Sequence, residues 1–375
     1  MRIAIITNII PTYREHFYDV ILNDSRFDIK VFCQDKQVGE NIKSIHKKYG
    51  DRVYLLKSYS PFNDNSLVLQ FLPIFDLFKN YDIFVVDGNL RHVSQAFLSM
   101  IFKLLGKKII IWSNVQTFGG NRILQKLRLT WWKIFDNFLM YTDKDVCELD
   151  KLGFKNKNII SINNGLNQNF INNQIKFWNE EKLSLFKQQH KINSNNIIIS
   201  SGRINIINQH DLTIEAVKSI KIFIPDILWI VIGNGSELER LKKKSKVYNL
   251  KNNICFLGEV YEEEEKCPWF LISKGFVHPG PIGLSLLNAY GYSLPVITHN
   301  STNNHGPEFS LFEDNKTGYL FEYRNCNDLV SKIIFLINNE TEVKKIRQNI
   351  FEIANFKNNT SVMADQFFNM IKLVN

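Results

Sequence analysis

Short apolar runs alternate with amphipathic helical patterns along this chain, in two series separated by a polar, asparagine-rich stretch. Runs such as Arg2–Thr7, Lys108–Ser113 and Ile197–Ser201 are mostly apolar, which is typical of strands buried on both faces. Strand–helix alternation of this kind predicts a parallel sheet with helices on both of its faces. Because the series occurs twice, the sequence predicts an α/β protein with two doubly wound domains.

The length of the chain fits two domains of usual size, because 375 residues exceed what one ordinary core holds. We expect an N-terminal domain over residues 1–168, a polar connection over 169–196 and a C-terminal domain over 197–355. A last helix, over 356–375, could pack back on the N-terminal domain. Two such domains in tandem predict a cleft between them, and ligands of doubly wound sheets bind outside the carboxyl ends of the strands.

Some local patterns bear on where individual elements begin and end. The sequence predicts a helix over Leu67–Lys79 and a long helix over Ile123–Phe138. Within the polar connection, Glu180–Gln189 has a helical pattern. The Gly-Asn-Gly sequence at 233–235 follows a predicted strand, but a dinucleotide fingerprint would need a third glycine where Leu238 stands. We therefore interpret it as a tight turn between a strand and a helix.

The chain has a formal net charge of +9, and its lysines are scattered along its length, which predicts a broad basic surface. Such a surface suits nucleic acid, an anionic membrane or a phosphorylated small molecule, although a composition rich in Lys and Asn also leaves this surplus without any such partner. The five cysteines are widely spaced and form no CxxC pair, which argues against a zinc site and indicates reduced thiols in the cytoplasm. We expect neither a signal peptide at the N-terminal run nor a membrane-spanning segment.

A glycine and an arginine directly follow the strand predicted over Ile197–Ser201. Gly202 permits a ligand to approach the backbone closely, and Arg203 offers a fixed fork of donors that suits phosphate. The alternative is a loop glycine beside a solvated arginine.

A loop rich in glycine and proline, 278–283, leads into a predicted helix. The backbone N–H groups of Gly283, Leu284 and Ser285 would point out of the start of this helix. Such a helix end binds phosphate through its unpaired donors and its dipole. The alternative is a helix start that is capped by water.

Taken together, the C-terminal motifs resemble glycosyltransferase family 4. The Gly-Arg-Leu…Lys-Gly…Leu-x-x-Ala block of that family is similar to GRINIINQHDLTIEAVK, and its Gly-Asp-Gly-Pro…Val-x-Phe-x-Gly block is similar to WIVIGNGSELERLKKKSKVYNLKNNICFLGEV. Its Glu-Gly-Phe-Gly-Leu…Glu-Ala…Gly-x-Pro-Val block is similar to GPIGLSLLNAYGYSLPVIT, and two shorter motifs resemble NKTGYLF and NNGLN. The matches follow the family's order from about Asn163 to Phe321, whereas the N-terminal half matches mainly by its strand–helix alternation.

The resemblance implies the GT-B fold, an α/β architecture in which two doubly wound, Rossmann-like domains face each other across a cleft. It also implies a nucleotide-sugar donor in the C-terminal domain, an acceptor in the N-terminal domain, retention of anomeric configuration, and no required metal or other cofactor. Carried over by position, Gly202 and Arg203 would contact the donor diphosphate, and the backbone of Gly283, Leu284 and Ser285 would donate hydrogen bonds to it.

Four positions that the resemblance aligns with charged or imidazole side chains are neutral in this chain. The family's lysine falls on Asn208, its two glutamates fall on Gly280 and Asn288, and a histidine falls on Asn114. Asn208 and Asn288 stay candidates for donor binding, and Asn114 is a candidate for catalysis or for acceptor binding. Glu308, in a His-Gly-Pro-Glu stretch, could supply a replacement carboxylate in catalysis, and the alternative is a loop that enters a helix.

The N-terminal half offers two further candidates. Arg14 follows the first predicted strand and could contact an acceptor or a phosphate, or it could be a solvated arginine at a helix start. A predicted helix of the same half combines basic residues with tryptophans, which suits the surface of an anionic membrane, although at least one tryptophan could pack in the core. These residues are Arg122, Lys126, Arg128, Trp131, Trp132 and Lys133.

These features predict a glycosyltransferase that transfers a sugar from a nucleotide-sugar donor to a saccharide or lipid-linked acceptor in cell-surface polysaccharide synthesis, in the cytoplasm or at the inner face of the membrane. One alternative is a catalytically silent relative that binds a partner or a nucleotide sugar, which the neutral replacements favour. Another is a GT-B sugar-nucleotide epimerase. Nucleic-acid binding is disfavoured, because no base-stacking motif accompanies the basic charge.

Overall fold

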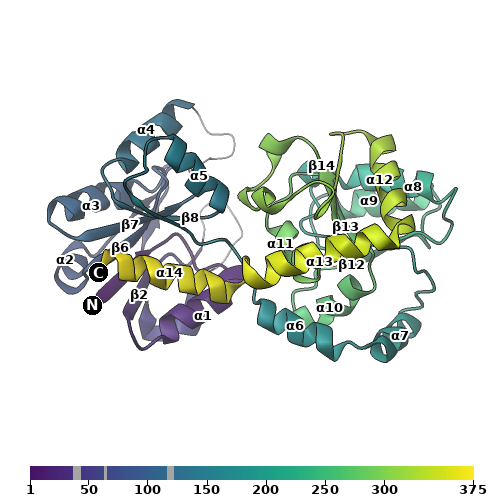
Figure 1. The fold of residues 1–375 in the computed structure, drawn as a ribbon, viewed down its shortest axis with the longest axis horizontal. Helices are drawn as coiled ribbons and strands as arrows, with labels where there is room; N and C mark the ends of the chain where they lie inside the picture. Colours follow the sequence, from purple (N-terminus) through teal and green to yellow (C-terminus); the bar gives the residue numbers. More distant parts are fainter. Residues whose placement is uncertain (37–43, 63–65, 116–121) are drawn as a thin grey trace. The chain divides into compact units, whose positions relative to one another are not determined.

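The computed structural model describes residues 1–36, 44–62, 66–115 and 122–375, and the chain divides into two compact units (Figure 1). The first unit contains residues 1–166 together with 359–375, and the second unit contains residues 167–358. Each unit contains a parallel sheet with helices packed on it. The predicted α/β class with two doubly wound sheets is therefore confirmed.

The sheet of the first unit has the strand order β3-β2-β1-β6-β7-β8-β9, and each neighbouring pair is parallel. Most of its residues are apolar and fully buried, as expected for strands that are covered on both faces. A separate antiparallel pair consists of β4 (Ser58–Tyr59) and β5 (Leu69–Gln70). The strands of the main sheet are β1 (Arg2–Ile6), β2 (Asp28–Cys33), β3 (Val53–Leu55), β6 (Ile83–Asp87), β7 (Lys108–Ser113), β8 (Asn137–Met140) and β9 (Asn158–Ser161).

Two groups of helices cover the two faces of this sheet, each over its own apolar cluster. On one face α14, from the C-terminus of the chain, packs beside α1, and the rings of Phe367 and Phe17 lie 5.9 Å apart. The other face is covered by α2 to α5, which contribute side chains such as Leu77, Phe102 and Trp132. The helices are α1 (Glu15–Asn23), α2 (Ile74–Asn80), α3 (Val93–Leu104), α4 (Arg122–Trp132), α5 (Asp143–Lys151) and α14 (Thr360–Val374).

The second unit has a six-stranded parallel sheet with the order β12-β11-β10-β13-β14-β15. Its strands are β10 (Ile197–Ser201), β11 (Leu228–Ile232), β12 (Ile254–Gly258), β13 (Gly275–His278), β14 (Val296–His299) and β15 (Gly318–Phe321). Its helices are α6 (Gln168–Phe177), α7 (Glu180–Gln189), α8 (His210–Ile220), α9 (Leu238–Val247), α10 (Glu263–Leu271), α11 (Leu284–Gly291), α12 (Cys326–Asn338) and α13 (Glu340–Phe356).

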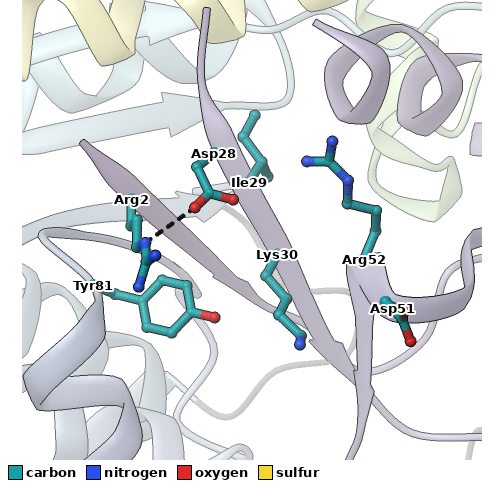
Figure 2. A pocket seen from close by; sticks show the side chains of 7 residues that line it. All are labelled: Arg2, Asp28, Ile29, Lys30, Asp51, Arg52 and Tyr81. Atoms are coloured by element: carbon teal, nitrogen blue, oxygen red, sulfur yellow. Dashed lines mark ion pairs between the residues drawn. The ribbon is translucent and has the colours of Figure 1, made fainter. Parts of the chain in front are cut away.

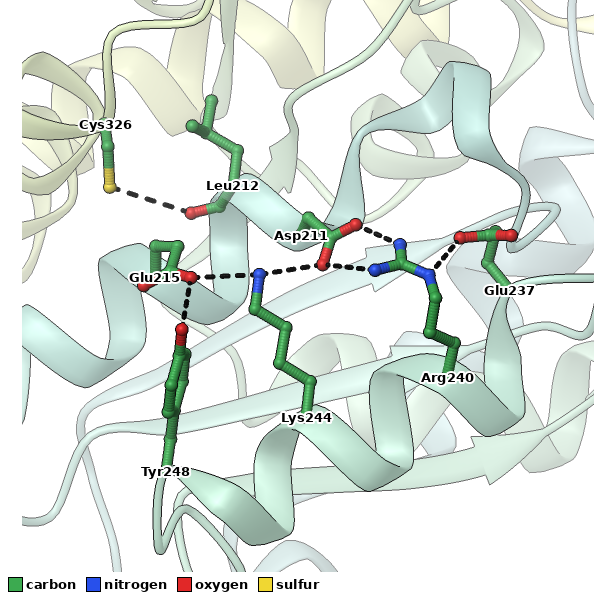
Figure 3. A network of polar contacts seen from close by, with 8 residues as sticks. All are labelled: Asp211, Leu212, Glu215, Glu237, Arg240, Lys244, Tyr248 and Cys326. Carbon is green, nitrogen blue, oxygen red and sulfur yellow. Dashed lines mark hydrogen bonds and ion pairs between the residues drawn. The ribbon is translucent and has the colours of Figure 1, made fainter.

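A network of charged side chains joins α8 to α9 (Figure 3). Asp211 on α8 accepts hydrogen bonds from Arg240 Nη1 at 3.1 Å and from Lys244 Nζ at 2.9 Å. Lys244 also lies 2.9 Å from Glu215, one turn further along α8. Each such partly exposed pair contributes only about 0.2–1 kcal/mol, but together they fix the helix that follows the loop of Arg203.

The structure corrects the sequence-based prediction in three segments. The helix predicted over Leu67–Lys79 is wrong in its first half, because Leu69–Gln70 pairs as a strand and α2 begins only after Pro73. The helix predicted over Ile123–Phe138 ends at Trp132, since Phe138 belongs to β8 and pairs with Ile111. A helix was also missed: α6 occupies Gln168–Phe177, and the side chain of Asn167 caps it by accepting from the Phe170 N–H.

Candidate functional site

The strand order of the second sheet reverses at β10, which lies between β11 and β13. In sheets of this kind, ligands bind beside the carboxyl ends of the strands at the point of reversal, because the loops there diverge to opposite faces. The loops in question follow Ser201 of β10 and His278 of β13. They carry the Gly202-Arg203 pair and the glycine-rich entry to α11, so the structure brings the two predicted phosphate-binding segments to one edge.

Gly202 marks the closest approach of these segments. Its φ of +149° is strained for other residues, and a Cβ there would lie 3.4 Å from the Ser285 Oγ of α11. Its carbonyl is in turn crowded by Gly233, where a Cβ would lie only 1.9 Å from the Gly202 oxygen. The Gly-Asn-Gly sequence therefore packs tightly against the β10 loop, which confirms its interpretation as a turn.

Arg203 extends from this loop with an exposed side chain. Across the described part of the chain, no carboxylate forms an ion pair with its guanidinium. Asn208, which stands where the resemblance expects a lysine, donates its side-chain N–H to the Arg203 carbonyl at 2.6 Å. The asparagine thus braces the loop backbone, while the side chain of Arg203 stays exposed at this edge.

Helix α11 starts directly behind Gly283, its N-cap residue, which has no side chain that could cap the helix. Ser285 and Asn288 are both partly buried and are three residues apart, so they share one face of the helix. Because Ser285 is the residue that approaches Gly202, this face is the one turned toward the β10 loop. Leu284 is exposed at the start of the helix.

Glu308 is also brought to the start of α11, although it lies far from it in sequence. Only 6% of this residue is exposed, and a Cβ at Gly283 would lie 3.4 Å from its Oε2. The segment is tied there by the Gly306 N–H, which donates to the Ile282 carbonyl at 2.7 Å. Glu308 lies in a short 3₁₀ helix, Pro307–Leu311, that begins with proline. The expected alternative, a loop that enters a helix, therefore describes the backbone here correctly. The Glu308 carboxylate nevertheless faces the glycine-rich loop.

Arg14 in the first unit is buried, with 8% exposure, so the alternative of a solvated arginine is wrong. Its Nη2 donates to the Asn164 Oδ1 at 3.0 Å, and its guanidinium lies 4.8 Å from the ring of Trp112 and 5.1 Å from that of Tyr141. These three partners were not found from the sequence, since they come from β7 and from the segments that follow β8 and β9.

The other candidate of the first unit, Asn114, directly follows β7 and is partly buried. The strand order of this sheet reverses at β1, which lies between β2 and β6, and β7 is the neighbour of β6. Asn114 therefore follows a strand close to this point of reversal. A small cavity there is lined by Thr7, Arg14 and Asp87 together with the rings around the arginine.

A second, more open pocket lies at the opposite edge of the first sheet (Figure 2). Its lining residues Arg2, Asp28 and Arg52 come from the beginnings of β1 and β2 and from the residue before β3, and Arg2 pairs with Asp28 at 3.0 Å. Because doubly wound sheets bind ligands at the carboxyl ends of their strands, this pocket is not a candidate for the active site.

Metal-binding clusters of His, Cys, Asp and Glu were also not found among the described residues.

Comparison with known proteins connects this geometry to a family. The family model "Glycosyl transferases group 1" matches residues 182–353, which lie in the second unit. A poly(ribitol-phosphate) alpha-N-acetylglucosaminyltransferase of Staphylococcus aureus is 30% identical over 43% of this chain and 32% of its own length. A poly(glycerol-phosphate) alpha-glucosyltransferase of Bacillus subtilis is 30% identical over 38% of this chain and 21% of its own length. The chain thus matches a third or less of each of these relatives.

Solved structures show the fold over the full length. The Anabaena protein Alr3699/HepE in complex with UDP superimposes with a TM-score of 0.72 at 13% identity, covering 100% of both chains. A glycosyltransferase from Rickettsia africae gives the same TM-score at 16% identity, covering 100% of this chain and 98% of its own. The two sheets therefore form the GT-B fold, and residues 182–353 of the second unit match the family described as glycosyl transferases group 1.

Proposed function

We propose that this chain is a retaining glycosyltransferase that transfers a sugar from a nucleotide-sugar donor to a saccharide or lipid-linked acceptor in cell-surface polysaccharide synthesis. The observation that carries the proposal is the edge of the second sheet at β10 and β13. There the exposed Arg203, the close backbone at Gly202 and the start of α11 converge. UDP is bound in the solved structure of the similar Anabaena protein, which supports a nucleotide as the ligand.

In the proposed mechanism, the site stabilises the nucleoside diphosphate as the leaving group. Arg203 and the first N–H groups of α11, at Leu284 and Ser285, would hold the charge that develops on the diphosphate when the sugar leaves. This charge stabilisation does not depend on a lysine at position 208, where Asn208 braces the loop instead. Asn288, one turn along the same face as Ser285, can both donate to and accept from a ribose hydroxyl.

Glu308 supplies the negative group of the site in this mechanism. A sugar that leaves a diphosphate develops positive charge at its anomeric carbon, and a nearby carboxylate stabilises that charge. The resemblance expects a glutamate at position 280, but a Cβ at Gly280 would lie 2.5 Å from the Asn208 Cα, so no larger side chain fits there. The proximity of Glu308 to Gly283 supports its assignment as the replacement carboxylate.

The acceptor is proposed to bind at the first unit, beside the carboxyl ends of β1, β6 and β7. Asn114 follows β7 at this edge, and Arg14 would hold the β1 loop in place through Asn164. Two relatives are named for poly(ribitol-phosphate) and poly(glycerol-phosphate), which favours an acceptor with a polyol or saccharide chain.

The test of this function is release of nucleotide from a panel of UDP-, GDP- and CMP-sugars, with and without lipid-linked acceptors. Release from one donor, with a glycosylated product, is the expected result. Product analysis separates transfer from epimerisation, which leaves the nucleotide attached. Donor binding without release would instead support the catalytically silent relative, which the neutral residues at 208 and 288 favour. A protein that neither binds nor cleaves any donor of the panel would contradict both functions.

We also propose that the first unit contacts a membrane, but not through the basic and aromatic face that the sequence predicted. Arg128, Trp131 and Trp132 are buried, so these three residues of the predicted basic and aromatic face cannot contact lipid. Helices α2, α3 and α4 pack on the same face of the sheet (Figure 1). Their outer sides expose large apolar side chains instead. This apolar outer face consists of Ile74, Phe75, Phe78, Val93, Phe97, Met100, Leu104, Ile123, Leu124 and Leu127.

Charge favours an anionic lipid surface as the occupant of the apolar outer face. Exposed cations border it at Lys79, Arg122 and Lys126, whereas Asp76 is the exposed acid on these helices. Phe75 is 92% exposed and Leu104 is 85% exposed, which is unusual for helices that face only water. No helix in the described part of the chain is long and apolar enough to cross a membrane, so the contact would lie in the plane of the interface.

We expect the full chain to sediment with phosphatidylglycerol vesicles at low salt, and less with phosphatidylcholine vesicles or at high salt. Leu104→Glu and Phe75→Glu should each weaken this binding by about tenfold or more, because each buried apolar side chain contributes about 1.5–3 kcal/mol. Phe223→Glu is the matched control, since Phe223 is 74% exposed in the second unit. Equal sedimentation with both lipids, or concentration-dependent dimers that the same substitutions abolish, would contradict the membrane assignment.

A further inference from the structure

Two buried histidines hold the loop that leads into α11. His278, at the end of β13, has its Nε2 3.1 Å from the Pro281 carbonyl, and because a carbonyl only accepts, Nε2 is the donor. On the other side, the Ile282 N–H donates to the His305 Nδ1 at 3.0 Å. The Ile282 carbonyl accepts from the Gly306 N–H at 2.7 Å. Both backbone groups of Ile282 are therefore satisfied by the segment that begins at His305.

The contacts of His305 require one particular neutral form of its ring. Its Nε2 lies 2.8 Å from the His299 carbonyl, so Nε2 carries the proton. Its Nδ1 receives the Ile282 N–H, so Nδ1 carries none. The ring is stacked between His299 at 4.1 Å and Phe309 at 4.0 Å, measured between ring centres. The imidazole is thus fixed in place and aimed at the backbone of Ile282.

We propose that His305 is a positioning residue of the donor site, whose neutral imidazole holds Ile282 and thereby the start of α11 where the diphosphate binds. The proposal rests on the proposed function for the identity of the ligand. His305 does not touch the donor in this assignment, because it acts through Ile282, which directly precedes Gly283.

Protonation of His305 would break this arrangement. A proton on Nδ1 would face the Ile282 N–H, so two donors would oppose each other and the hydrogen bond would be lost. Burial holds the pKa of His305 below its ordinary value, and the hydrogen bond to the His299 carbonyl opposes this shift in part. The titratable neighbours are His299, whose pKa burial lowers to about 4, His278, whose pKa burial lowers to about 3, and Glu308 in the same segment.

The direction of the pH effect follows from these shifts. A released loop exposes His305, which then binds protons at its ordinary pKa of about 6.5, whereas the held loop binds them only at lower pH. The held loop is therefore fully stable above about pH 6.5 and loses stability as the pH falls below that value. Donor affinity should fall with it.

The first test measures the loop without any ligand, by amide hydrogen exchange in the full chain. His305→Ala should speed exchange in the peptide that spans residues 279–287, by about tenfold, because it removes one hydrogen bond. His305→Asn should retain protection, since its Oδ1 can accept from Ile282 in place of Nδ1. Equal exchange in all three proteins would overturn the assignment of His305 to this loop, whatever the function of the chain.

The second test measures affinity for UDP at pH 7.5 and pH 5.5 by calorimetry. We expect His305→Ala to weaken binding by about tenfold, while His305→Asn stays within about threefold of the unmodified protein. We expect UDP to bind the unmodified protein more weakly at pH 5.5 than at pH 7.5. Because asparagine cannot be protonated, the UDP affinity of His305→Asn should not fall in this way. Identical pH dependence in the two proteins, or equal weakening by Asn and Ala, would overturn the proposal.

His210→Asn is the matched control for loss of a buried histidine. His210 opens α8, and burial lowers its pKa to about 4, but its ring neighbours are Trp229 and His278 rather than the backbone of Ile282. UDP affinity at pH 7.5 should be unchanged in this variant. If the unmodified protein binds no UDP while the exchange pattern is as expected, the choice of ligand fails and the positioning role of His305 stands.

Discussion

Glu308→Gln is expected to lower kcat by about 100-fold while changing the KM for the donor by less than about threefold. The amide has the same shape as the carboxylate and can keep hydrogen bonds that the oxygen accepts, but it carries no charge. A loss in kcat would therefore report the charge that faces the reacting sugar. Initial rates with the donor found in the nucleotide-release panel provide the measurement.

Glu313→Gln is the control for this substitution, because Glu313 lies close by in sequence and pairs with Lys316 on the surface. It should leave kcat unchanged, since exposed ion pairs contribute little. If Glu308→Gln retains its kcat within about threefold, Glu308 is a structural residue at the start of α11 and the catalytic carboxylate lies elsewhere.

Arg14→Ala is expected to destabilise the first unit by about 2–4 kcal/mol. The substitution removes a long side chain from a buried position and removes the hydrogen bond that Arg14 Nη2 donates to the Asn164 Oδ1. It also removes the guanidinium from the rings of Trp112 and Tyr141. Urea unfolding followed by tryptophan fluorescence measures the change in the free energy of unfolding.

The control is Arg26→Ala in the same unit, where the arginine is largely exposed and pairs with Asp24. This variant should change the free energy of unfolding by less than about 0.5 kcal/mol. An Arg14→Ala protein as stable as the Arg26→Ala protein would show that the buried charge costs as much as its contacts contribute. The role of Arg14 in holding the β1 loop would then be wrong.

The two sheets could be predicted from the sequence because their strands are nearly continuous apolar runs. Ile197–Ser201 and Leu228–Ile232 were both predicted, and they pair in register as β10 and β11. The two-residue strand Leu69–Gln70 could not be found, because it is defined by its pairing with Ser58–Tyr59, which a pattern along the chain does not reveal. Helix α6 was missed because its sequence is rich in Asn and Gln. Ile171 is its one buried apolar side chain, so the helix has no apolar stripe that the sequence could reveal.

The site was predictable where a motif sits directly at the end of a strand. Gly202 and Gly283 follow β10 and β13, and parallel strands bring their carboxyl ends to one edge. The position of Glu308 had no such signal, since it depends on the hydrogen bonds that tie His305 and Gly306 to Ile282. The burial of Trp131 and Trp132 likewise follows from the packing of α4 on the sheet, which its basic composition does not reveal.

The measurement that tests the central claim most directly is calorimetric titration of the full chain with the donor, comparing the unmodified protein with Arg203→Ala. The central claim is that the donor diphosphate binds at the edge formed by β10 and β13, where Arg203 is exposed and forms no ion pair with the described residues. We predict that the substitution weakens binding by about 1.5–3 kcal/mol, the contribution of a hydrogen bond to a charged group. An unchanged dissociation constant would contradict the account and remove Arg203 from the site.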